Sequence, residues 1–147
     1  MSGAALLDVN VLLALFDSTH MAHAQTARWL LGNLTRWATC AVTENGFARI
    51  RANPSYPSPI PVARSLAQLE RARQSAEHEF WPCDVSLADP ATVDRSRLLT
   101  GSATTDVYLL ALAVRHNGRL VTLDQRITPE AVPGALPEHL VVLRAGG

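Results

Sequence analysis

The sequence contains no lysine, because all 13 of its basic residues are arginine. This absence excludes several chemistries that depend on a lysine amine. A phosphate-binding P-loop needs a lysine on the phosphates, and a Schiff-base enzyme needs one as its nucleophile. Phosphatase and phosphoacceptor domains also place an aspartate after their first strand, but they pair it with a lysine near the phosphoryl group. The missing lysine argues strongly against that class.

Cysteine and excess charge are scarce as well. Cys40 and Cys83 stand singly in apolar surroundings without the paired spacing of a zinc site. We therefore expect both to be reduced core residues. The 13 acidic residues balance the basic ones and leave a net charge of +0. The chain thus lacks the global basic field of many nucleic-acid binders, and any such contact must be local.

Long uninterrupted apolar runs are missing too. The run from Ala4 to Phe16 is broken by Asp8 and Asn10 and has no basic leader, so neither a signal peptide nor a membrane span is expected. We expect a cytoplasmic protein that makes no membrane contact. A length of 147 residues with 48% hydrophobic composition predicts a single domain over 1–147.

Short apolar segments alternate with amphipathic ones along the chain. They predict strands at 4–7, 37–42, 79–86, 119–124 and 139–144, and helices at 9–16, 23–34, 44–52, 62–76, 91–99 and 104–118. Thr43 is the expected cap of the third helix, Thr104 or Thr105 that of the last, and Gly118 its terminator. Pro82 lacks a ladder donor, so the third strand is expected at a sheet edge. The proline-rich segment 53–61 is expected to be a loop.

Strands that alternate with helices predict an α/β fold, with a mostly parallel sheet of about five strands covered on both faces. Ligands bind such sheets beyond the carboxyl ends of the strands. Asp8, Glu44 and Asp124 each follow a predicted strand, and Asp106 lies in the first turn of the last helix. We therefore expect these four carboxylates at one edge of the sheet.

Each acid has a simpler explanation when it is taken alone. Asp8 can cap a helix, and Glu44 and Asp106 can be first-turn acids that the helix dipole favours. Asp124 can belong to a turn. Their common edge favours a shared role, because gathered carboxylates raise one another's pKa unless a cation is present. Mg²⁺ or Mn²⁺ prefers such oxygen ligands, and either ion supports phosphodiester hydrolysis.

Several ordered motifs make the chain similar to a known family. LLDVNVLLALF (6–16), HAQTARWL (23–30), TENGFARI (43–50) and TTDVYLLALAVRHNGRLVTLDQRI (104–127) resemble the PIN domain, and more narrowly the VapC-type toxin nucleases of bacterial toxin–antitoxin pairs. The resemblance covers almost the whole chain. It implies a three-layer α/β/α PIN-like domain and a metal-dependent endoribonuclease that cuts RNA and inhibits translation.

By this resemblance, Asp8, Glu44, Asp106 and Asp124 match the acidic positions that hold Mg²⁺ or Mn²⁺ and support cleavage. Asn10 and Thr105 match polar positions that support them with hydrogen bonds. The resemblance also implies a homodimer and a cognate VapB-type antitoxin, in a higher toxin–antitoxin assembly.

Residues 49–73 hold five arginines and one acid, which suits either phosphate contact or a solvated helix face. Arg49 follows Glu44 by one to two helical turns, and it is the best RNA-binding candidate. The competing interpretation of the whole chain is a catalytically silent PIN-like module that binds RNA or protein.

Overall fold

Five parallel strands form the central sheet of the structure, a computed structural model that describes residues 3–33, 36–98 and 100–144. The sheet order is β3-β2-β1-β4-β5, and every neighbouring pair is parallel. The strands are β1 (Ala5–Leu7), β2 (Trp37–Cys40), β3 (His78–Trp81), β4 (Arg119–Thr122) and β5 (Leu140–Val142). All five predicted strands are present, although β3 ends at Trp81 and residues 82–86 of the predicted third strand are irregular. This strand is at an edge, as Pro82 indicated.

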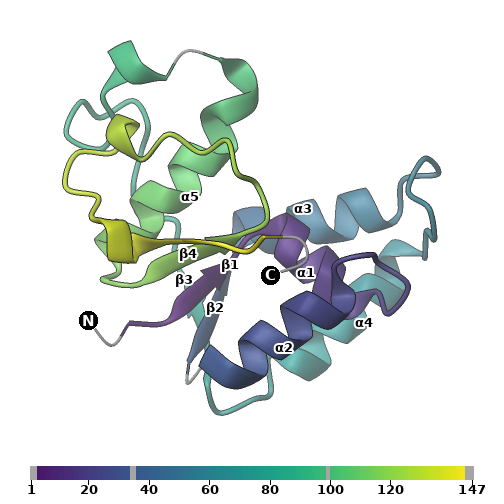
Figure 1. Ribbon diagram of the computed structural model, residues 1–147. Helices are drawn as coiled ribbons and strands as arrows, with labels where there is room; N and C mark the ends of the chain where they lie inside the picture. Colours follow the sequence, from purple (N-terminus) through teal and green to yellow (C-terminus); the bar gives the residue numbers. More distant parts are fainter. Residues whose placement is uncertain (1–2, 34–35, 99, 145–147) are drawn as a thin grey trace.

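The helices cover both faces of this sheet. They are α1 (Val9–Phe16), α2 (His23–Asn33), α3 (Ala41–Arg51), α4 (Val62–Ala72) and α5 (Thr104–Arg115). Short 3₁₀ helices occupy Arg95–Arg97, Gly101–Ala103, Pro129–Ala131 and Pro137–His139. Figure 1 shows α5 on one side of the sheet and α1 to α4 on the other. The predicted three-layer α/β/α architecture is therefore confirmed.

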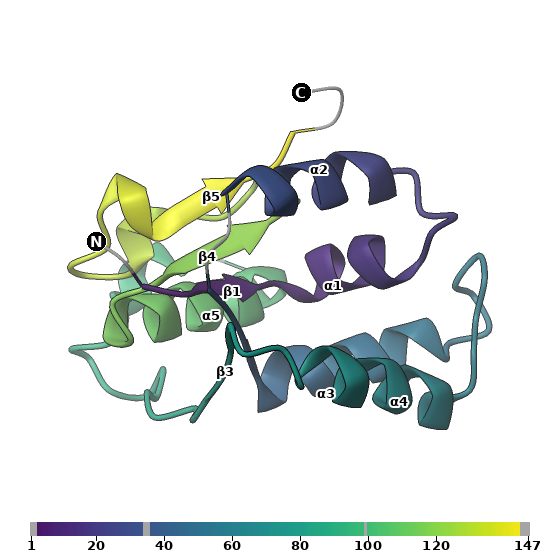
Figure 2. The ribbon, with the colours of Figure 1, turned by 90° about the horizontal axis from the view of Figure 1, so that it is seen from below.

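The alternation of side chains along the strands explains these layers. Leu6 of β1 and Leu120 of β4 pack with α5, whereas Leu7 and Val121 pack with α1 and α3. Successive strand residues point to opposite faces, so two separate apolar cores form, one on each side of the sheet. Figure 2 shows α1 between α2 and α3, with α4 beside α3.

Close packing brings α3 against the start of α1. A Cβ atom at Gly46 would lie 2.7 Å from Cγ2 of Val9, which is closer than real contacts allow. The absence of a side chain at Gly46 thus permits this approach. As a result, α3 lies beside the residue that follows Asp8.

Several local expectations were wrong. The predicted helix 91–99 is a loop with one short 3₁₀ turn at Arg95–Arg97; its residue 99, like residue 34 of the predicted second helix, lies outside the described residues. Neither Thr43 nor the threonines at the start of α5 act as N-caps, because Cys40 and Ala103 occupy those positions. Gly118 was expected to terminate the last helix, but α5 ends at Arg115 and it is Asn117, at φ 54°, that takes the left-handed conformation typical of a helix end. Cys83 is exposed, and only Cys40 is a core residue.

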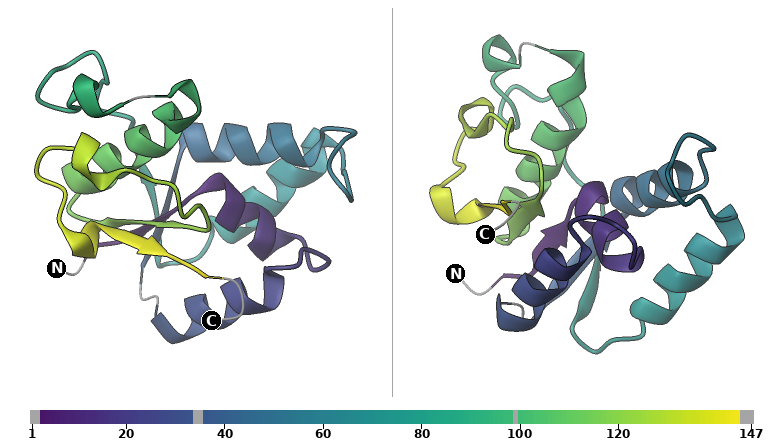
Figure 3. Two further views of the ribbon diagram at one scale, coloured as in Figure 1. Left: turned by 45° about the horizontal axis from the view of Figure 1, so that its top comes forward. Right: turned by 45° about the vertical axis from the view of Figure 1, so that its right-hand side comes forward.

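Segment 53–61 is irregular, as its prolines predicted, and it connects α3 to α4. Figure 3 shows it at the end of these two helices that is farther from the sheet. Among the described residues, none of the helices combines the length and the apolar character needed to cross a membrane.

Candidate active site

Asp8 lies where β1 gives way to α1, and it is almost fully buried. Its backbone N–H donates to the carbonyl of Val121, which ties it to the end of β4. Its Oδ1 accepts from the Val9 N–H at 2.7 Å, and its Oδ2 accepts from the Thr122 hydroxyl at 2.7 Å. Asp8 therefore does cap α1, and the cap fixes its carboxylate beyond the sheet.

Thr122, the last residue of β4, connects the polar groups of this edge. Its buried hydroxyl donates to Asp8, and the oxygen of this hydroxyl accepts from the backbone N–H of Asp124 at 3.0 Å. Asn10 also reaches Thr122, at 3.3 Å, and its Oδ1 accepts from the Leu123 N–H at 3.0 Å. Asn10 thus ties α1 to the loop after β4. The sequence reasoning missed Thr122, although its place two residues before Asp124 on a strand was a usable signal.

Asp106 and Asp124 lie near one another, and each carboxyl group affects the pKa of the other. Burial, together with the charges of Asp8 and Asp124, raises the pKa of Asp106 to about 7. The pKa of Asp8 is also raised, chiefly by burial and further by Asp124, although its bonds from Thr122 and Val9 oppose the shift. The site thus concentrates negative charge that is only partly compensated.

Arg126 compensates the negative charge of Asp124. Its guanidinium Nε lies 3.1 Å from Oδ1 of Asp124, and the Arg126 backbone N–H donates to the same oxygen at 2.9 Å. These bonds hold the pKa of Asp124 below its ordinary value. The side chain of Arg126 is 88% exposed, so the ion pair lies at the surface.

Two hollows meet at Asp106. The first hollow, about 530 Å³, is shared by α1, α3 and the start of α5. It is lined by Asp8, Val9, Asn10, Leu13, Val42, Asn45, Gly46, Arg49, Ile50, Thr105 and Asp106. The second hollow, about 390 Å³, is lined by Arg97, Leu98, Thr100, Ser102, Ala103, Asp106, Val107, Asp124, Arg126 and Thr128. The carboxylates therefore border a surface that continues on both sides.

Glu44 is not brought to this cluster. Its Oε2 accepts from the Thr39 hydroxyl at 2.7 Å, and its Oε1 lies 3.4 Å from Nη1 of Arg73. His78 Nε2 lies 2.8 Å from the same Thr39 oxygen, which links the group to β3. On α3 it is Asn45, the next residue, that lines the first hollow. The structure thus brings three of the four expected carboxylates together, the role of Glu44 stays a prediction, and sequence reasoning overlooked Asn45.

The two remaining candidates line the first hollow. Thr105 is exposed at the start of α5, beside Asp106. Arg49 is exposed on α3, and within the described part of the chain it has neither a hydrogen bond nor an ion pair from its guanidinium. Both positions are open to a ligand that enters the hollow.

The three converging residues provide the oxygen ligands that a hard divalent cation prefers. Burial is the main cause of the raised pKa values of Asp8 and Asp106, and the neighbouring carboxylates raise them further. A bound cation would favour the ionised form of both groups, so the donor set fits Mg²⁺ or Mn²⁺. Within residues 3–33, 36–98 and 100–144, however, no three His, Cys, Asp or Glu side chains are already arranged to hold a metal ion. Asp124 is turned to Arg126, so binding requires a local rearrangement of side chains.

The chain is similar to known proteins over most of its length. The PIN domain family model matches residues 5–129. Ribonuclease VapC44 of Mycobacterium tuberculosis is 54% identical over 140 residues, which span 95% of this chain and 99% of that protein. Ribonuclease VapC39 of the same species is 42% identical over 133 residues, which span 88% and 95% of the two chains.

A solved structure shares the fold. The crystal structure of VapBC2 from Rickettsia felis, bound to a DNA fragment from its promoter, matches with a TM-score of 0.57 at 12% identity, over 96% of this chain and 98% of that one. This match concerns the fold alone. The family model and the two relatives show that the chain belongs to the PIN-domain family and, within it, to the VapC type.

Proposed function

We propose that the chain is the endoribonuclease toxin of a type II toxin–antitoxin system and that it hydrolyses RNA phosphodiester bonds with Mg²⁺ or Mn²⁺. The observation that carries the proposal is the convergence of Asp8, Asp106 and Asp124 from three different elements at one edge of the sheet. The VapC ribonucleases, similar over almost the whole chain, support the substrate class.

A divalent cation, when bound, supplies Lewis-acid chemistry and neutralises charge on the phosphodiester. Asp8, Asp106 and Asp124 are the residues that would hold it. Thr122 and Asn10 keep Asp8 and the loop after β4 in a fixed relation, and Thr105 borders the same hollow. Arg49 is placed to contact the RNA. Glu44 joins the ligand set only when its carboxylate leaves Thr39 and Arg73.

A VapB-type antitoxin is the proposed partner, and the VapBC2 structure from Rickettsia felis supports this assignment. We propose that it neutralises the toxin in the cytoplasm, where cleavage of RNA would stop translation and growth. A homodimer and a larger toxin–antitoxin assembly are part of the same proposal.

The test is to sequence the new RNA ends that form when the purified protein is incubated with total RNA. Wild type is expected to give discrete ends with Mg²⁺ or Mn²⁺ and none with chelator. Asp106→Asn is expected to lower cleavage at least about a hundredfold, since it removes a charged ligand of the cation. Asp89→Asn, which neutralises an exposed acid in a different cavity, is the matched control and should cut like wild type.

Two results would contradict the proposal. Identical ends from wild type and Asp106→Asn would show that the carboxylates are not the active site. Metal binding without any cleavage would favour the silent binding module instead.

A further inference from the structure

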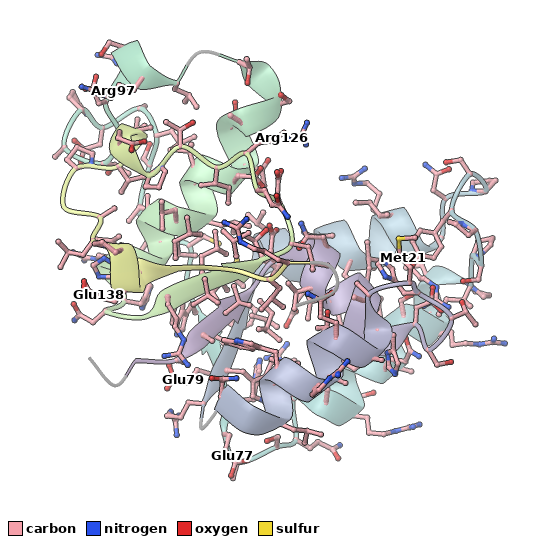
Figure 4. The ribbon with its side chains drawn as sticks, viewed as in Figure 1. Met21, Glu77, Glu79, Arg97, Arg126 and Glu138 are labelled. Atoms are coloured by element: carbon pink, nitrogen blue, oxygen red, sulfur yellow. The ribbon has the colours of Figure 1, made fainter. Side chains whose placement is uncertain are left out.

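Arg126 and the part of the second hollow beyond Asp106 and Asp124 have no role in the function proposed above. The second hollow shares Asp106 with the first hollow, so the two hollows adjoin at this carboxylate. Arg49 lines the first hollow and Arg126 lines the second. Figure 4 shows Arg126 beside the start of α5, with Arg97 farther along the same side of the molecule.

The lining of the second hollow suits part of a nucleotide. Thr100, Ser102 and Thr128 contribute hydroxyl groups that can donate to or accept from a ribose or a base edge. Leu98, which is half-buried, contributes apolar surface. Its volume of about 390 Å³ is within the range of small-molecule sites. A chain of nucleotides that leaves Asp106 therefore finds polar and apolar partners there.

Arg126 has the properties of a residue that exchanges one anionic partner for another. Its ion pair with Asp124 is at the surface, where such pairs contribute only about 0–1 kcal/mol to stability. A phosphate can take the place of the carboxylate, because the guanidinium binds both by the same planar geometry. A cation on Asp124 would favour the exchange by neutralising the present partner.

Resting on the proposed function, we propose that RNA crosses the site from the first hollow to the second and that Arg126 contacts the phosphate beyond the scissile bond. Arg126 is a substrate-binding residue, and Arg49 has the equivalent place on the opposite side. Along this path, the enzyme contacts at least one nucleotide on each side of the cleaved bond.

The decisive variant is Arg126→Gln, and the matched control is Arg115→Gln. Arg115 is also exposed, at 61%, and is also paired with an aspartate, but it lies at the far end of α5 from Asp106. Binding of fluorescent single-stranded 20-residue RNAs of randomised sequence is measured in chelator over a range of salt concentrations. Arg126→Gln is expected to weaken binding about three- to tenfold and to reduce the salt slope by about 0.7, the loss of one phosphate contact.

In the cleavage assay, Arg126→Gln is expected to raise KM with little change in kcat, and Arg126→Lys should recover part of the loss. Unchanged affinity, slope and KM in Arg126→Gln would overturn the RNA path while leaving the ribonuclease intact. If wild type failed to cleave but bound RNA through Arg126, the path would stand and the proposed function would fall. Equal losses in Arg126→Gln and Arg115→Gln would also overturn the path, because they would reflect general charge alone.

Discussion

At the scale of single residues, the site depends on a hydroxyl group that is not a ligand. Thr122 donates to Asp8 and accepts from the Asp124 backbone. The bond to Asp8 also opposes the rise in the pKa of that buried carboxyl. One strand residue therefore helps to position Asp8 and Asp124 and favours the ionised form of Asp8.

Replacing Thr122 by Val tests this role. The change keeps the shape of the side chain but leaves Oδ2 of the buried Asp8 without its partner, so we expect the free energy of unfolding to fall by about 1–3 kcal/mol. The pKa of Asp8 should rise further, which would move the pH profile of cleavage to higher pH. Urea unfolding and the pH dependence of kcat/KM measure the two effects.

Two variants serve as controls for Thr122→Val. Thr122→Ser keeps the hydroxyl and should restore most of the stability and the wild-type pH profile. Thr26→Val removes another buried hydroxyl, one that has no hydrogen-bond partner in the described part of the chain, and it should cost almost nothing. Equal destabilisation by Thr122→Val and Thr26→Val would show that the bond to Asp8 contributes nothing specific.

At the scale of elements, a buried network joins the end of α1 to the loop between α3 and α4. Asp17, the C-cap of α1, accepts from the hydroxyls of Thr19, Tyr56 and Ser58. Arg51, at the end of α3, donates from Nε to the Ser58 carbonyl at 2.9 Å. The two helices that border the first hollow are thus linked at their far ends, which fixes Asp8 relative to Asn45 and Arg49.

Tyr56→Phe should loosen this link. Burial alone would raise the pKa of Asp17, but the hydrogen bonds from Thr19, Tyr56 and Ser58 hold it well below its ordinary value. Loss of the Tyr56 bond to this charged group should lower the free energy of unfolding by about 1.5–3 kcal/mol at pH 7. The pKa of Tyr56 is raised to about 12, so its hydroxyl remains a donor throughout the range tested.

The sign of the pH effect follows from the lowered pKa of Asp17. Its stabilisation is complete above the ordinary carboxyl value and is lost as the pH falls, so the gap between wild type and Tyr56→Phe should shrink below about pH 4. Ser55→Ala, in the same loop but exposed, is the control and should leave stability unchanged. A gap that did not change with pH would refute the role of Asp17. Thermal unfolding at several pH values gives the answer.

The order of elements and the sheet edge were predictable, because they follow from hydrophobic period and from the connection rules of parallel sheets. The directions in which individual side chains point could not be predicted in this way. Glu44 and Asn45 are neighbours about 100° apart on α3, so the start of the helix decides which of them faces Asp8. The sequence indicated a start after Thr43, whereas α3 begins at Ala41. The partners of Glu44, on β2 and at the end of α4, come from distant parts of the chain.

At the scale of the whole molecule, the carboxylates make the metal-free fold sensitive to pH. The folded protein raises the pKa of Asp106 to about 7, above its ordinary value. The cost of ionising it is absent below about pH 4 and grows as the pH rises toward 7. Asp8 shifts in the same direction. We therefore expect the Tm of the metal-free protein to fall between about pH 5 and pH 8, where Asp17 is already fully ionised in both states.

Asp106→Asn and divalent cations should each remove the destabilisation that ionised Asp106 causes in the folded protein, by different means. The substitution should raise the metal-free Tm at pH 7.5 by about 2–6 °C, since an amide carries no charge to repel Asp8 and Asp124. Mg²⁺ or Mn²⁺ should raise the Tm of wild type at pH 7.5 by mass action, and less at pH 5.5, where protons compete for the same oxygens. In Asp106→Asn the metal effect should be largely lost.

Differential scanning fluorimetry over pH and metal concentration measures all of these effects, with Asp89→Asn as the charge-matched control that should behave like wild type. The fall in Tm with rising pH and the rise in Tm with metal have a common cause. The ionised carboxylates that destabilise the metal-free protein are the groups that would bind the cation. A variant that kept the full metal response after Asp106 was neutralised would separate them, and it would remove Asp106 from the metal site. A metal response that was the same at pH 5.5 and 7.5 would mean that the ion binds elsewhere.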